Sequence, residues 1–380
     1  MKTKMEKTIM LNNNVALVKK DIVPQYDMIV FCHLRWEFVY QRPQHLISRL
    51  SKNMKVLFVE EPIAKSPGAK DTYTTINITE NIDVFKPKVD DIEDIALLLK
   101  KFLKSNKPVI GWFYSSSFSP LLTVINFETV IYDCMDELSL FKGASKHLIN
   151  QEKFLLSHAD IVFTGGKSLF ESKKNLHSNV YCFPSSVDET HFAKAQNGIE
   201  VPSDIFFLNN PIVGYYGVID ERIDLELLHN TAKILPNVSF VMIGPLAKIE
   251  DGDLPKDQNI YYLGMRSYEV LPNYLKAFDI AMMPFALNES TKYISPTKTL
   301  EFMAADKPII STKIKDVVRD YENCINLIDT AKEFANTITT ILDSDKSMLS
   351  KQEGYCKILK NTSWDATAQK MTTIINTFAK

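Results

Sequence analysis

Several features that mark other classes of protein are missing from this sequence. No apolar run reaches the ~18 residues that a membrane-spanning helix needs, and the first 20 residues lack the apolar core of a signal peptide. The five cysteines are odd in number and scattered, which disfavours a disulfide framework, and no pair has zinc-site spacing. The net charge of −2 gives no electrostatic footprint for nucleic acid. We therefore expect a cytoplasmic protein with no nucleic-acid partner.

The motifs of common nucleotide-binding enzymes are also missing. No Gly-x-Gly-x-x-Gly turn follows the first predicted strand, which disfavours a dinucleotide oxidoreductase. The segment Gly165–Ser168 resembles a phosphate loop, but Ile161 stands where a Walker motif requires glycine. No Ser-His-Asp arrangement is legible. No Asp-x-Asp pair has a suitable strand-end context, so we expect no metal or other cofactor.

What is present is an ordinary globular composition, with 45% hydrophobic and 24% charged residues. The 380 residues are too many for one core, so two domains are expected. Predicted strands alternate with predicted helices in two successive series. The strands of the first series are Met28–Cys32, Lys55–Glu60, Val109–Phe113, Thr129–Tyr132, Ile161–Thr164 and Val180–Phe183. Those of the second are Ile212–Tyr216, Ser239–Ile243, Ile260–Leu263, Ile280–Met283, Ile309–Thr312 and Ile325–Ile328. This alternation predicts an α/β protein with two doubly wound parallel sheets.

The predicted domain boundaries follow the two series of strands. They are a loosely ordered extension (1–24), a first Rossmann-like domain (25–190), a polar linker (191–210), a second Rossmann-like domain (211–362) and a final helix (363–380). Doubly wound sheets bind their ligands at the carboxyl ends of the strands. We therefore expect the functional site in a cleft between the two domains.

The most informative stretch is Asn288–Thr312. Ser295 is a candidate N-cap and Pro296 suits the first helical position, which predicts a helix start with free N–H groups that favour phosphate. Lys298 lies in the first turn, where a cation opposes the helix dipole. Glu301 lies one turn on and could accept hydrogen bonds from vicinal sugar hydroxyls. Together they predict a nucleotide-sugar site, and the alternative is an amphipathic helix with a Lys298/Glu301 surface pair.

This stretch resembles the donor-binding segment of GT-B glycosyltransferases, close to glycosyltransferase family 4, in which a helix-borne Glu holds the nucleotide ribose. Other matching pieces occur in the family's order from about Met28 onward: RWEFVYQRPQHL, YDCMDELSLF, ADIVFTGGKSLFESK, VYCFPSSVDETHF, YYGVIDERID, MPFALNEST and SPTKTLEFMAADKP. The resemblance is closest to bacterial enzymes of cell-surface polysaccharide assembly, such as teichuronic-acid transferases. It implies two Rossmann-like domains facing a cleft, with a C-terminal helix that crosses back to the first domain.

The resemblance also implies a set of donor contacts in the second domain. Gly217 matches the glycine after the first strand of that domain. Arg222 falls near the family's lysine, whereas Val218 replaces its arginine, so we expect Lys298 to supply the missing cation. The alternative for Arg222 is a surface pair with Asp220 or Asp224. Glu301 would bind the ribose. The other expected donor-binding residues are Gly244, Asn288, Glu289, Ser295 and Thr297.

One carboxylate of the family's paired Glu motif is missing. Its position falls on Tyr293, which leaves the choice of transferred sugar open. Asn288, Ser290 and Thr291 are candidates to supply hydrogen bonds in its place.

The first domain is expected to hold the acceptor. The loop after its first strand has no glycine, but it is aromatic and basic, with Arg35, Trp36 and Arg42, and His45 follows in the next helix. Aromatic faces stack on sugars, and Arg can pair with the phosphate of a lipid-diphosphate acceptor. The alternatives are plain packing of Trp36 under the loop and a structural role for His45.

Two carboxylates follow another strand of the first domain. Asp133 and Asp136 could orient an acceptor hydroxyl or act as a base, and the alternative for Asp136 is helix capping. With Arg222 and Lys298, they complete the set of expected catalytic residues.

The resulting hypothesis is a metal-independent glycosyltransferase that uses a nucleotide sugar, with a UDP-sugar as the leading candidate. The acceptor would be a surface glycan or its lipid carrier, and a lipid-linked acceptor would bring the protein to the inner face of the membrane. The resemblance implies that the anomeric configuration is retained. A sugar-nucleotide 2-epimerase on the same fold and a non-catalytic nucleotide-sugar-binding subunit are the alternatives, the latter favoured by the missing Arg and Glu.

Overall fold

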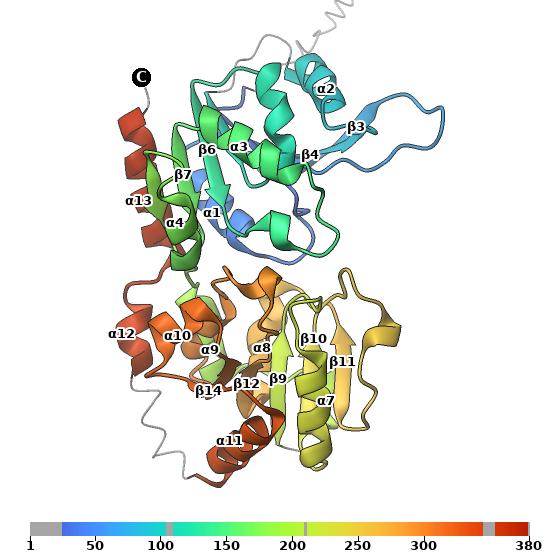
Figure 1. Ribbon diagram of the computed structural model, residues 1–380, viewed down its shortest axis with the longest axis vertical. Helices are drawn as coiled ribbons and strands as arrows, with labels where there is room; N and C mark the ends of the chain where they lie inside the picture. Colours follow the sequence, from blue (N-terminus) through green and yellow to red (C-terminus); the bar gives the residue numbers. More distant parts are fainter. Residues whose placement is uncertain (1–24, 104–108, 209–210, 345–353, 379–380) are drawn as a thin grey trace, which may run out of the picture.

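The computed structural model describes residues 25–103, 109–208, 211–344 and 354–378. The predicted extension, residues 1–24, lies outside the described residues. Two α/β domains are stacked along the long axis of the molecule, with the first domain at the top of Figure 1 and the second at the bottom. Among the described residues, no helix combines the length and apolarity needed to cross a membrane.

The first domain is built on an eight-stranded sheet. In spatial order its strands are β3 (Thr72–Thr79), β4 (Ile82–Lys88), β2 (Val56–Glu60), β1 (Met28–Cys32), β5 (Ile110–Phe113), β6 (Thr129–Cys134), β7 (Ile161–Thr164) and β8 (Val180–Cys182). The strands β1, β2, β5, β6 and β7 are buried along their whole length, as their largely apolar sequences favour. The chain changes winding direction between β1 and β5, which opens a crevice at their carboxyl ends.

One edge of this sheet departs from the prediction. The strands β3 and β4 were not predicted, and they pair with each other in antiparallel fashion, so the sheet is mixed rather than parallel. The exposed edge strand β3 alternates exposed and half-buried residues, and it projects from the side of the domain (Figure 1). The β-branched run TYTTINIT was the available sequence signal.

Helices cover both faces of the first sheet. On one face lie α2 (Asp94–Leu103), the 3-10 helix η1 (Ser116–Thr123), α3 (Leu148–His158) and α4 (Lys167–Lys173). On the other face, α1 (Arg42–Leu50) packs with the C-terminal helix α13 (Trp364–Phe378). Because Trp364 and Met371 of α13 belong to the first domain's core, the predicted crossing of the final helix is confirmed (Figure 1).

The second domain has a six-stranded parallel sheet. In spatial order its strands are β11 (Ile260–Gly264), β10 (Ser239–Ile243), β9 (Ile212–Tyr216), β12 (Ile280–Met283), β13 (Ile309–Thr312) and β14 (Asn326–Ile328). Its helices are α7 (Leu225–Ile234), α8 (Leu271–Ala277), α9 (Lys298–Ala304), α10 (Lys315–Tyr321), α11 (Ala331–Asp343) and α12 (Tyr355–Leu359). This order confirms the doubly wound fold, and it places the crevice beside the loops that follow β9 and β12.

The segment predicted as a linker is folded into the second domain. It contains α5 (Glu189–Phe192), η3 (Ala193–Gln196) and α6 (Ser203–Phe206). Phe192 and Ile205 are buried in the second domain's hydrophobic core. Because these helices have only four residues each, they produce no readable periodicity in the sequence.

Candidate functional site

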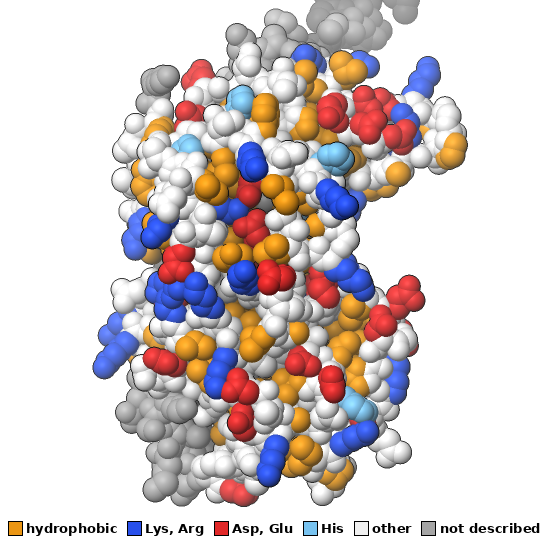
Figure 2. All heavy atoms as spheres, viewed as in Figure 1, with side chains coloured by type: hydrophobic (Ala, Val, Ile, Leu, Met, Phe, Trp, Pro, Cys, Tyr) orange, Lys and Arg blue, Asp and Glu red, His pale blue; other side chains and the backbone are white. Residues whose placement is uncertain are grey.

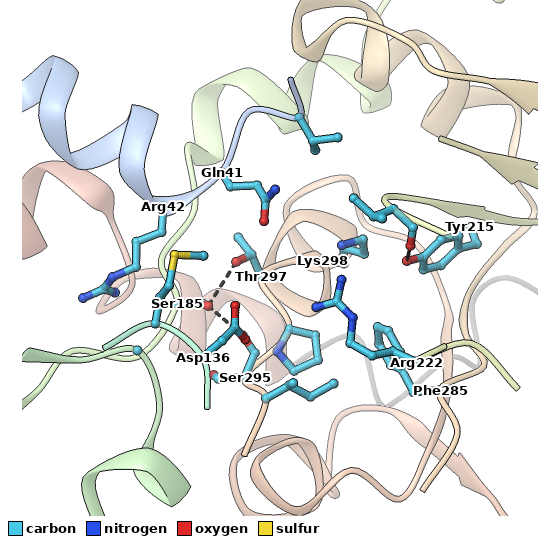
Figure 3. Close-up of a pocket in the computed structure, with 16 residues that line it drawn as sticks. Gln41, Arg42, Asp136, Ser185, Tyr215, Arg222, Phe285, Ser295, Thr297 and Lys298 are labelled. Carbon is cyan, nitrogen blue, oxygen red and sulfur yellow. Dashed lines mark hydrogen bonds between the residues drawn. The ribbon is translucent and has the colours of Figure 1, made fainter. Parts of the chain in front are cut away.

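The carboxyl ends of the two sheets face each other across a cleft. Figure 2 shows the molecule hollowed at the waist between the domains, with charged side chains gathered there. A cavity in this cleft is lined from the first domain by Gln41 and Asp136, and from the second by Arg222, Ser295 and Lys298 (Figure 3). The site is therefore built at the topological switch points of both sheets.

The second domain's wall begins with α9, which starts later than predicted. Thr297 already has a right-handed helical backbone (φ −56°, ψ −32°) and caps nothing with its side chain, so Ser295 is not the N-cap. The Thr297 hydroxyl donates to Ser185 Oγ at 3.0 Å, and Ser185 Oγ donates to the Ser295 carbonyl at 2.7 Å. These groups join the domains beside the cavity, as the dashed lines of Figure 3 show.

Lys298 lies over the backbone of Gly217. A Cβ at position 217 would come within 2.1 Å of Lys298 Cε, and the φ of Gly217 is +139°, so only glycine fits without strain. Gly244 (φ +149°) packs equally closely, since its Cβ would lie 1.8 Å from the Gly217 carbonyl oxygen. The two predicted glycines thus make room for the lysine. Lys298 Nζ has no ion-pair partner among the described residues, and burial lowers its pKa.

Glu301 follows Lys298 by one turn on the same face of α9. Its carboxylate is 7% exposed and accepts a 2.6 Å hydrogen bond from the hydroxyl of Tyr216. Burial raises the pKa of Glu301, while Lys298 and the Tyr216 hydrogen bond act to lower it. A second oxygen of the carboxylate is left for another donor, and the pocket beside it is also lined by Tyr40 and Tyr268.

Arg222 comes from the loop after β9. Its guanidinium makes a bidentate contact with Asp220 at 2.7–3.1 Å and lies 5.4 Å from the ring centre of Phe141 in the first domain. Burial acts to lower the pKa of Arg222, but Asp220 raises it above its usual value. In Figure 3, Arg222 and Lys298 point toward the same part of the cavity. The structure therefore brings together two of the predicted cations.

Asp136 faces these cations from the first domain (Figure 3). Its carboxylate has no hydrogen-bond partner among the described residues. Burial raises the pKa of Asp136 to about 6, an effect that Arg222 and Lys248 oppose and Asp220 reinforces. Asp136 is therefore a free carboxylate whose proton affinity lies near the neutral range, as a hydroxyl-binding or proton-accepting group requires. The alternative role for Asp136 was helix capping. The structure does not show it, because the N-cap of the next helix, η2 (Leu138–Leu140), is Glu137.

Two predicted donor residues do not reach the cavity. Asn288 caps η6 (Glu289–Thr291): its side chain accepts from the Thr291 N–H and the Ser290 hydroxyl, and donates to the Glu221 carbonyl. The Glu289 side chain is 70% exposed and pairs with Lys292 at 3.5 Å. Local turn formation and the pair with Lys292 use their polar groups, so the structure gives no cavity contact for either residue.

The most consequential correction concerns Arg42 and Asp133. The Arg42 guanidinium donates to the Asp133 carboxylate at 2.8–3.1 Å and to the Phe183 carbonyl at 2.8 Å, and both side chains are buried. In Figure 3 the Arg42 guanidinium points away from the cavity. Arg42 lines the cavity, but its side chain is 6% exposed and its guanidinium is directed at Asp133 and Phe183, which is the arrangement of a structural pair; Arg222, paired with Asp220, is 23% exposed.

The other predicted acceptor residues are also used by the fold. Arg35 donates to the buried Glu60 at 3.1 Å, and Trp36 packs edge-on against Phe58 at 5.0 Å. His45 is 2% exposed and stacks on Trp364 of α13 at 4.8 Å, and burial lowers its pKa far below the usual value. The structural alternatives for Trp36 and His45 are therefore the correct ones.

A comparison with known families agrees with this geometry. Residues 210–344, which include Arg222, Lys298 and Glu301, match the family model described as Glycosyl transferases group 1. The second domain is therefore similar to glycosyltransferase group 1 domains. The predicted resemblance to GT-B glycosyltransferases is thereby confirmed at the level of the family.

Similar proteins extend the match beyond the second domain. A Bacillus subtilis (strain 168) protein, named provisionally as the teichuronic acid biosynthesis glycosyltransferase TuaH, is 24% identical over 222 residues. That alignment covers 53% of this chain and 55% of the relative, so it spans about half the length of each protein.

Among solved structures, sucrose-phosphate synthase from Thermosynechococcus elongatus has a TM-score of 0.70 at 15% identity, covering 92% of this chain and 98% of its own. The Anabaena protein HepE, solved in complex with UDP and glucose, has a TM-score of 0.65 at 12% identity, covering 93% and 100%. At this identity the likeness establishes the GT-B fold.

Several residues around the second domain's cavity were not predicted. Tyr216 and Asp220 flank Gly217 in the sequence, and each holds a predicted residue in place. Phe141 and Lys248 meet across the cleft from loops 107 positions apart by residue number. The available sequence signal for these four residues was their position shortly after predicted strands and turns. No group of three or more His, Cys, Asp or Glu among the described residues could hold a metal ion.

Proposed function

We propose that this protein is a glycosyltransferase that transfers a sugar from a nucleotide donor, with a UDP-sugar as the leading candidate. The observation that carries the proposal is the grouping of Lys298, Arg222 and Glu301 around Gly217 at the cleft. A nucleotide sugar needs this combination, because it presents a diphosphate beside vicinal ribose hydroxyls. HepE was solved with UDP and glucose, and a similar Escherichia coli structure with UDP-2-fluoro glucose, which supports the same class of donor.

In the proposed complex, Glu301 accepts hydrogen bonds from the ribose, and the nucleoside lies in the pocket beside Tyr216 and Tyr268. The diphosphate passes over Gly217, where no side chain blocks its approach. Lys298 and Arg222 then neutralise the charge that develops on the diphosphate as the sugar leaves. Because these cations can supply the required charge, we propose that transfer needs no metal ion.

The acceptor would enter from the first domain's side of the cleft. Asp136 accepts a hydrogen bond from the attacking hydroxyl in this proposal. The acceptor we propose is a cell-surface glycan or a lipid-linked saccharide, and the name of the Bacillus subtilis relative supports this choice. We also propose retention of the anomeric configuration, action in the cytoplasm and, for a lipid-linked acceptor, work at the inner face of the membrane.

The first test measures nucleotide binding by calorimetry and thermal unfolding. We expect UDP at about 100 times its dissociation constant to add about 2.7 kcal/mol to the free energy of unfolding. Glu301→Gln and Glu301→Ala should weaken UDP binding by about 10- to 100-fold, because a charge-assisted hydrogen bond contributes about 1.5–3 kcal/mol. Glu301→Gln keeps a partner for Tyr216, so it separates binding from folding.

Glu289→Gln is the matched control, since Glu289 is a nearby carboxylate whose side chain is mostly exposed. A protein that bound no UDP, GDP, ADP or CMP, alone or as a sugar conjugate, would overturn the proposal. Turnover of a UDP-sugar without any acceptor would instead indicate an epimerase. Acceptor-dependent release of UDP in the presence of EDTA is the expected result.

A further inference from the structure

One cation on the second domain's wall plays no part in the proposed donor contacts described above. Lys248 lies in the loop after β10, and its φ is +60°. Of the described residues other than glycine, Lys248 and Asp306 are the two with positive φ. Left-handed backbone is disfavoured for a lysine, and such strain persists where the surrounding structure requires it, often at functional sites.

The Lys248 side chain reaches the first domain. Its Nζ lies 4.4 Å from the ring centre of Phe141 and 3.6 Å from Glu221 Oε1. Phe141 directly follows η2 (Leu138–Leu140) of the first domain. The guanidinium of Arg222 lies 5.4 Å from the centre of the same ring. Two cations of one domain therefore share one aromatic ring of the other.

Both cations lie within 5.4 Å of the same ring centre, so both contribute positive potential at this point of the cleft. The face of an aromatic ring attracts cations, so Phe141 offsets part of the repulsion between Lys248 and Arg222. The carboxylates of Asp220 and Glu221 offset a further part, although the Lys248–Glu221 contact is long at 3.6 Å. A preorganised pair of cations of this kind matches the oxygens of a phosphate group, which several donors can contact at once.

The pair also opens onto a cavity. Lys248, Arg222 and Phe141 line a space of about 450 Å³ between the domains, together with Asp136 and His33. Burial, with the Lys248 charge as the second cause, lowers the pKa of His33 to about 4. His33 is therefore neutral at pH 7 and adds no charge to the cavity. Its Nδ1 is buried and has no hydrogen-bond partner in the described parts of the chain.

We propose that Lys248 and Arg222 form a phosphate-binding subsite whose floor is the ring of Phe141. The inference rests on the proposed function, since Arg222 also contacts the donor there. The phosphate has two chemical sources: the terminal phosphate of the nucleoside diphosphate, or a phosphate carried by the acceptor saccharide. Lys248 thereby supplies positive charge that neither Lys298 nor Arg222 provides on the side of the cavity nearest the first domain.

The test is calorimetric titration of wild type, Lys248→Gln and Lys248→Gly with UDP, UMP, glucose 6-phosphate and inorganic phosphate. For a donor phosphate, we expect both variants to bind UDP about tenfold more weakly and UMP within about twofold of wild type. For an acceptor phosphate, the tenfold loss would fall on glucose 6-phosphate or inorganic phosphate, with UDP unchanged. Either pattern supports the subsite.

Two comparisons separate binding from folding. Lys248→Gly should unfold at the same temperature as wild type or higher, because glycine adopts φ +60° without strain. Lys256→Gln is the matched control: Lys256 lies in the same domain, pairs with Asp251 at 2.8 Å and lies 5.9 Å from the ring of Tyr262. It should bind every ligand as wild type does.

Failure of the subsite differs from failure of the proposed function. If wild type binds UDP and both Lys248 variants bind all four ligands equally well, the subsite is wrong and the glycosyltransferase proposal stands. If wild type binds no nucleotide, the glycosyltransferase proposal fails. Loss of phosphate binding in the Lys248 variants would then still support the anion site alone.

Discussion

The two walls of the cleft carry similar residue types but use them differently. On the first domain's wall, Arg42 and Asp133 neutralise each other in a buried pair, and Arg35 is held by Glu60. On the second domain's wall, Lys298 has no ion-pair partner among the described residues, and Glu301 keeps an oxygen free beside a single tyrosine. A charged side chain that is paired within the protein stabilises the fold, whereas one without an ion-pair partner at a cavity is available to a ligand.

The difference follows from the cost of removing charge from water. A buried charge is tolerated when a partner satisfies it, and an unpaired one shifts its pKa toward the neutral form. Arg42 and Asp133 take the first course. Lys298 and Asp136 take the second, with the pKa of Lys298 lowered and that of Asp136 raised by burial. For Lys298 and Asp136, the pKa shift thus has the direction expected of a buried charge that has no ion-pair partner among the described residues.

The largest expected effect tests the first domain's wall. Arg42→Ala should lower the free energy of unfolding by about 3–5 kcal/mol, because it leaves the buried Asp133 carboxylate without its partner. Urea denaturation measures this loss. Lys292→Ala, which removes one side of the exposed pair with Glu289, should change the stability by less than about 0.5 kcal/mol. A similarly small change for Arg42→Ala would contradict the claim that the charges on the first domain's wall stabilise the fold.

The second effect tests the opposite wall. Lys298→Met should weaken UDP binding by about 10- to 100-fold, since it removes a charged donor to phosphate. Its free energy of unfolding should stay unchanged or rise, because an unpaired, partly buried ammonium is replaced by an apolar chain of similar length. Calorimetric titration and urea denaturation of the same preparation measure both quantities. A marked loss of stability with normal UDP affinity would place Lys298 among the structural charges.

A third effect concerns a contact between the domains outside the cavity. The buried Asp316 of α10 accepts hydrogen bonds from the Ser168 N–H at 3.1 Å and the Ser168 hydroxyl at 2.5 Å, in the first turn of α4. Asp316→Ala should cost about 1–2 kcal/mol of unfolding free energy, as the loss of a helix cap does. Lys315→Ala removes a neighbouring exposed pair with Glu171 and should cost less than about 0.5 kcal/mol in the same urea series.

The smallest effect is a pH dependence at Asp136. Its pKa of about 6 lies above that of an ordinary aspartate, so the charged form costs folding free energy above pH 6 and none below about pH 4. Asp136→Asn should therefore raise the free energy of unfolding at pH 8 by on the order of 1 kcal/mol, with no gain at pH 4.

The pH dependence of acceptor-dependent turnover provides a second test of Asp136. In wild type it should fall as the pH drops through about 6, where the carboxylate takes up a proton. The residual turnover of Asp136→Asn should lack this step. A variant with the same pH profile as wild type would remove Asp136 from the reaction.

The sequence predicted the regular elements well because they depend on local periodicity. The prediction for Met28–Cys32 coincides with β1. It missed β3 and β4, whose strand signal lies at an exposed edge. It also placed the start of α9 too early, because Ser295 bonds across the domain boundary instead of capping the helix.

By itself, the sequence determined the α/β alternation, the strand ends that build the cleft, and the glycine, lysine and glutamate that meet there. These features follow from residue types at fixed short spacings. Only the tertiary structure decided which charges remain available, because pairing depends on distances between residues remote in the chain. Arg42 pairs with Asp133, which is 91 positions away in the chain. Lys298 instead lies against the backbone of Gly217, so its charge remains available to a ligand.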